Sequence, residues 1–140
     1  MGQREFGPVE LITTAFDRQE VPTEVIRALT RVPHRAAKIL DVVIVTREFD
    51  NGLVFTEYEE ARTEHGLPEL ELEAIGLTAE EDALALAEEL EPGTSALIVA
   101  LEPVWVRDLA TAFGEGGGMV IGHSWIPAAV VNEIADVAIR

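Results

Sequence analysis

Asp41, His123 and Trp125 are the side chains whose types and positions could support chemistry in this sequence. Asp41 lies within an apolar run, and a carboxylate buried there needs hydrogen bonds, a cation or an exposed edge. It could act as a ligand or a proton-transfer group, or it could pair with a nearby arginine. His123 shares a strand face with Trp125, where it could bind a metal or haem, transfer protons, or be held by local hydrogen bonds. We take these three as candidate ligand-binding residues.

The motifs that usually identify an enzyme do not occur in the sequence. His34, His65 and His123 show no metal-ligand spacing, and the chain has no cysteine that could bind a metal or attack a substrate. The glycine run at 114–118 leaves a predicted helix and enters a predicted strand, whereas a phosphate-binding loop runs from a strand into a helix. We therefore expect no catalytic residue, no metal site and no cofactor.

The composition limits the partners that the protein could bind. Its 140 residues fit one domain, and the formal net charge is −16, with 26 Asp and Glu against 10 Lys and Arg. Lys38 is the only lysine, so nucleic acid and anionic membranes are poor partners. The expected partners are further copies of the chain or a basic protein.

The charge is unevenly distributed along the chain. Residues 57–91 contain 13 acidic residues and one basic residue, Arg62. Residues 18–38 contain five basic and two acidic residues. A solvated surface is the ordinary role of such an acidic stretch. We expect an acidic connection at about 57–77.

No membrane span or signal peptide is expected from the sequence. The longest apolar run is shorter than the roughly 18 residues that a membrane-spanning helix needs. Residues 1–8 lack the apolar core of a signal peptide. Together with the absence of cysteine, these features lead us to expect a cytoplasmic protein.

Hydrophobic patterns and turn signals predict the order of the secondary structure. Asp50-Asn51-Gly52 is a hairpin signal, because asparagine and glycine accept positive φ angles. Thr78 and Glu81 form the pattern of a capping box at a helix start. The predicted strands are 9–16, 36–47, 53–58, 95–101 and 119–126, and the predicted helices are 22–32, 78–90, 103–113 and 127–139. We expect 59–76 to be irregular and Trp105 to pack in the core.

Two segments, 9–45 and 95–126, repeat one pattern: a strand, a helix that starts at a proline, and a second strand. Two right-handed βαβ units folded together form a ferredoxin-like sheet. We predict a single α+β domain over residues 1–140, with the sheet order 5-1-4-2-3 when strands are numbered along the chain. The helices lie mainly on one face, the hairpin strand extends one edge, and an extra helix follows at the C-terminus.

Short segments along nearly the whole chain resemble a known family. They are 7–10, 39–45, 90–97, 117–120 and 125–127. They resemble small acidic actinobacterial proteins that form a domain of unknown function. A related family has a glycine-zipper membrane insert where this chain has its acidic stretch, so the resemblance implies no membrane insertion. It implies the fold and a bacterial cytosolic setting, and it supplies no activity or catalytic residue.

Two functions remain open from the sequence. The first is a non-enzymatic, oligomeric protein with a regulatory, stress or interaction role. It is favoured because the last helix has more apolar surface than one contact needs. In that case the acidic stretch would contact a basic partner or the basic first helix of a neighbouring copy. The alternative is a small-molecule binder or cofactor-light enzyme of the dimeric α+β barrel type, with a pocket on the open sheet face.

Overall fold

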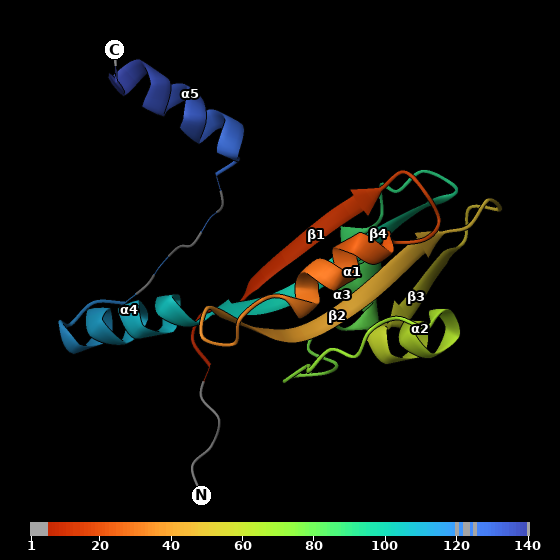
Figure 1. Ribbon diagram of the computed structural model, residues 1–140, viewed down its shortest axis with the longest axis horizontal. Helices are drawn as coiled ribbons and strands as arrows, with labels where there is room; N and C mark the ends of the chain where they lie inside the picture. The colour runs from red at the N-terminus through yellow and green to blue at the C-terminus, as the bar shows by residue number, and fades with distance from the viewer. Residues whose placement is uncertain (1–5, 120, 122–123, 125, 140) are drawn as a thin grey trace, which may run out of the picture. The chain divides into compact units, whose positions relative to one another are not determined.

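The computed structural model describes residues 6–119, 121, 124 and 126–139 (Figure 1). The chain forms two compact units, Met1–Leu109 and Ala110–Arg140. Within the described residues the fold is α+β, with one four-stranded antiparallel sheet and five helices. The elements are β1 (Glu10–Phe16), α1 (Thr23–Thr30), β2 (Ala37–Arg47), β3 (Leu53–Glu57), α2 (Tyr58–His65), α3 (Glu80–Leu86), β4 (Thr94–Pro103), α4 (Val104–Glu115) and α5 (Ala128–Ile139).

The sheet belongs to the first unit and has the order β1-β4-β2-β3. β4 pairs antiparallel with both β1 and β2, so β1 and β2 run parallel to each other with β4 between them. This is the split βαβ arrangement predicted for the first repeat. The fifth predicted strand, 119–126, lies partly outside the described residues, so the complete order 5-1-4-2-3 stays a prediction.

The β2–β3 hairpin forms where its turn residues predicted it. Arg47 pairs with Leu53 at the end of the ladder, and Asn51 has a φ of 78°. The amide of Glu48 donates to the carbonyl of Gly52 at 2.8 Å. The Gly52 amide donates to the Asp50 carboxylate at 3.0 Å, which fixes the turn. This prediction is confirmed.

Helices cover both faces of the sheet (Figure 1). On one face Ile26 of α1 and Tyr58 of α2 pack with Val42, Leu97 and Val99. On the other face Ala83 and Ala87 pack with side chains of β2 and β4 that point away from α1, namely Val43, Val45, Ala96 and Ile98. β4 is buried on both faces, as its continuous apolar run predicted.

Helix α2 corrects the prediction that 59–76 is irregular from its start. Its glutamates suggested a loop, but Tyr58 and Ala61 are buried on the sheet and stabilise a helix. Gly66 ends it in the left-handed conformation with a φ of 61°. The Tyr58 hydroxyl donates to the carbonyl of Pro68, and burial raises the pKa of this tyrosine. Only the part of the connection after α2 is irregular.

Helix α3 is shorter than predicted, and its capping box is absent. The helix begins at Glu80, its N-cap is Ala79, and no side chain caps it. The Thr78 hydroxyl is buried and has no hydrogen-bond partner among the described residues. The Thr78 amide instead donates to Asp41, which holds this residue one position outside the cap.

Helices α4 and α5 bound the glycine run in the second unit. The Gly118 amide donates to the carbonyl of Phe113 at 2.7 Å, and Gly117 has a φ of 84°, so the run ends α4 as predicted. Only Val106 of α4 is buried. Trp105 is 65% exposed, so the prediction that it packs in the core is wrong. The first turn of α4 leaves it on the solvent side of Val106.

Candidate functional site

Asp41 lies in an irregular part of β2, where the register with β4 shifts between Ile39 and Asp41. The residue is 1% exposed. One carboxylate oxygen accepts the amide of Val42 at 3.0 Å, and the other accepts the amide of Thr78 at 2.9 Å. These bonds account for the burial of the carboxylate, since each oxygen has a donor. Asp41 thereby ties the residues before α3 to the sheet.

The backbone holds the same connection at a second point. The Ala74 amide donates to the carbonyl of Leu40 at 2.8 Å, and the Glu73 amide donates to the carbonyl of Ile39 at 3.2 Å. The irregular part of β2 therefore uses side chain and backbone together to fix the acidic connection. Its carbonyls are available because the register shift interrupts the ladder with β4.

His123 and Trp125 lie outside the described residues. Of the three candidate ligand-binding residues, the structure therefore describes Asp41 alone. It does not bring these residues together, and their joint role in binding a ligand stays a prediction.

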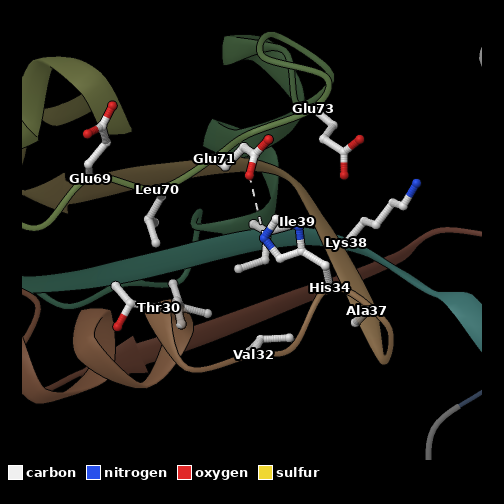
Figure 2. Close-up of a pocket in the computed structure, with 11 residues that line it drawn as sticks. Thr30, Val32, His34, Ala37, Lys38, Ile39, Glu69, Leu70, Glu71 and Glu73 are labelled. Carbon is white, nitrogen blue, oxygen red and sulfur yellow. Dashed lines mark ion pairs between the residues drawn. The ribbon is translucent and has the colours of Figure 1, made fainter.

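A cavity of about 200 Å³ lies between the end of α1, the start of β2 and the acidic connection (Figure 2). Its apolar lining includes Leu29, Ile39 and Leu70. Nε2 of His34 is 3.5 Å from a carboxylate oxygen of Glu71, and both side chains are largely exposed. The cavity can enclose a small molecule, but none of its charged side chains is buried.

Glu102 is a buried charged residue that sequence reasoning missed. It is 0% exposed at the end of β4. One oxygen accepts Nε of Arg107 at 3.0 Å and the Gly7 amide, and the other accepts Nη2 of Arg107. The hydrogen bonds from Arg107 hold the pKa of this carboxyl below its ordinary value, against the effect of burial.

This cluster joins the N-terminal segment to the first turn of α4. A Cβ atom on Gly7 would lie 2.7 Å from Cα of Arg107, so only glycine allows this approach. The available signal in the sequence was a glutamate at the end of an apolar strand, five residues before an arginine on a helix. The arrangement is that of a structural ion pair, since the carboxylate has donors from both neighbours.

A family model described as a family of unknown function (DUF6325) matches residues 5–140. The chain belongs to this family. The match covers nearly the whole chain and includes both compact units. No curated protein and no solved structure matches the chain. Family membership therefore agrees with an unknown function and assigns no catalytic residue.

The charged surface of the first unit of this family member is divided between its helices. On α1 and the turn after it, Arg27, Arg31 and Arg35 are exposed and form no ion pair within the described part of the chain. On α2, Glu60 and Glu64 are exposed. Around α3 the exposed charges are all acidic: Glu80, Glu81, Asp82, Glu88, Glu89 and Glu91.

Two searches of the described residues gave no further site. No group of three or more histidine, aspartate or glutamate side chains among them is placed to hold a metal ion. No helix in this part of the chain is long and apolar enough to cross a membrane.

Proposed function

We propose that the protein is a non-enzymatic cytoplasmic protein that assembles with copies of itself in a regulatory, stress or interaction role. One observation carries the proposal. Arg27, Arg31 and Arg35 are exposed and without ion-pair partners in the described residues of a chain that has 26 acidic residues. A basic surface on an acidic protein is complementary to the rest of the same protein, so a second copy is a suitable partner.

Electrostatic attraction of this kind acts over a short range in salt. The Debye length is about 10 Å at 0.1 M salt and about 3 Å at 1 M, so attraction between exposed charges falls steeply as salt is added. Assembly through such surfaces should therefore weaken with salt, whereas assembly through apolar surfaces should not.

A basic protein is a second possible partner. The six acidic side chains around α3 have no basic neighbour on that surface, and they repel another copy of the same surface. If such a partner exists, it should bind the α3 surface and leave the α1 arginines accessible.

We also propose that residues 119–126 form a fifth strand beside β1, which would complete the ferredoxin-like order 5-1-4-2-3. β1 is an edge strand of the sheet, and Leu11 and Ile12 are 52% and 44% exposed. An exposed apolar edge strand attracts a further strand. Hydrogen exchange of the β1 amides tests this: protection of both edges of β1 supports it, and rapid exchange on one edge contradicts it.

Native mass spectrometry of the purified protein at low and high salt tests the proposed assembly. An integer multiple of the chain mass at low salt that dissociates at high salt supports it. A monomer at every salt concentration contradicts it. A surplus mass that is lost on denaturation would instead indicate a bound ligand and contradict a purely self-assembling role.

A further inference from the structure

Helices α1 and α2 lie on the same face of the sheet (Figure 1). Their buried residues, Ile26 and Tyr58, belong to one core cluster. A cavity of about 220 Å³ separates the loop before α1 from α2, and side chains of β2 and β3 line it, including Ile44, Thr46 and Thr56. The two helices therefore border one shallow groove.

The exposed charges on these two helices have opposite sign and the same spacing. Arg27 and Arg31 are four residues apart on one side of the groove, and Glu60 and Glu64 are four residues apart on the other. Like charges at this spacing destabilise a helix by a few tenths of a kcal/mol. Within the described residues the only ion-pair partner of these four is His65, whose Nε2 is 3.8 Å from Glu64.

We propose that this face is a two-fold interface between copies of the chain, an inference that rests on the proposed self-assembly. Arg27 and Arg31 of one copy pair with Glu60 and Glu64 of the other. The two-fold axis then forms the same contact a second time with the roles exchanged. A surface with both signs side by side is self-complementary, as an isologous interface requires.

The opposite face of the sheet does not meet this requirement. Glu80, Glu81 and Asp82 lie at the start of α3, and no exposed basic residue lies on this helix. Two such faces repel each other. The α3 face therefore points away from the two-fold axis and remains in solvent.

Charge reversal tests the interface, with sedimentation velocity at low salt as the measurement. All four side chains are exposed, so the variants should fold, and circular dichroism checks this. Arg27→Glu with Arg31→Glu, or Glu60→Arg with Glu64→Arg, should each weaken the dimer by at least about tenfold, roughly 1.4 kcal/mol. The quadruple variant should recover the wild-type dimer, since the two signs have only changed places. Glu80→Arg with Glu81→Arg on α3 is the control and should leave the dimer intact.

A mixture of the two double variants gives a further check, because one has two acidic helices and the other has two basic helices. They should form a 1:1 heterodimer, although neither dimerises alone. A wild-type dimer that all the α1 and α2 reversals leave unchanged, or a quadruple variant that stays monomeric, would overturn this interface and leave self-assembly standing. A wild-type monomer at every salt concentration would overturn both.

Discussion

The two faces of the sheet are built differently, and the difference separates stability from assembly. The α1–α2 face has the larger apolar core, to which Leu67, Leu70 and Leu72 of the acidic connection also contribute. The α3 face has alanines and valines, and by strand alternation it also carries the buried carboxylates of Asp41 and Glu102. Outside, the first face presents both signs of charge, whereas the second presents one sign. Only the first face is suited to a second copy of itself.

The largest expected effect comes from the apolar anchor of the first face. Ile26 is 0% exposed, so Ile26→Ala should lower the free energy of unfolding by about 2–5 kcal/mol through lost burial and a cavity. Urea denaturation measures it. Ala83→Gly is the matched change on the α3 face and should cost about 1 kcal/mol. Equal losses from the two variants would contradict the difference between the faces.

Asp41→Asn should have the next largest effect. The amide group keeps one acceptor oxygen, so either Val42 or Thr78 loses its hydrogen bond, and burial makes this cost about 1–3 kcal/mol. We expect faster hydrogen exchange at the Thr78 amide in the variant. Unchanged stability together with loss of binding to a small molecule would instead support Asp41 as a ligand-binding residue.

The acid sensitivity of the Glu102 pair should be smaller, because Arg107 is partly exposed and solvent screens the pair. The hydrogen bonds from Arg107 lower the folded-state pKa of Glu102 below the ordinary value of 4.5. The pair therefore stabilises the fold fully above pH 4.5, and this stability is lost as the pH falls through the folded-state pKa. Unfolding of the wild type and of Glu102→Gln, compared across this range, should converge at low pH. A constant difference between them would contradict this role.

Much of the fold could be predicted because local patterns agreed with tertiary packing. The hairpin followed from Asn51 and Gly52, and the apolar run of β4 placed it inside the sheet. Helix α2 was missed because its stability comes from burial of Tyr58 and Ala61, which a local reading of its glutamates does not reveal. Pattern analysis cannot see a packing partner that is distant in the chain.

The candidate site was harder to predict for the same reason. The partner of Asp41 is the backbone of Thr78, and a backbone donor leaves no signature in the sequence. The capping box misled because its threonine amide was already committed to that carboxylate. The Glu102 pair depends on Gly7, 95 residues earlier in the chain, so its local pattern was too weak to recognise.

Disulfide trapping tests the two-fold interface most directly, because the chain contains no cysteine of its own. Ala28→Cys on α1 and Thr63→Cys on α2 lie beside the charged pairs, and a disulfide requires Cα atoms within about 7 Å. A mixture of these two variants, one carrying a mass tag, should form a crosslinked heterodimer at low salt and much less at high salt. Ala85→Cys on α3 should not crosslink to Thr63→Cys. Crosslinking through α3, or none between α1 and α2 in an assembled sample, would contradict the proposed interface.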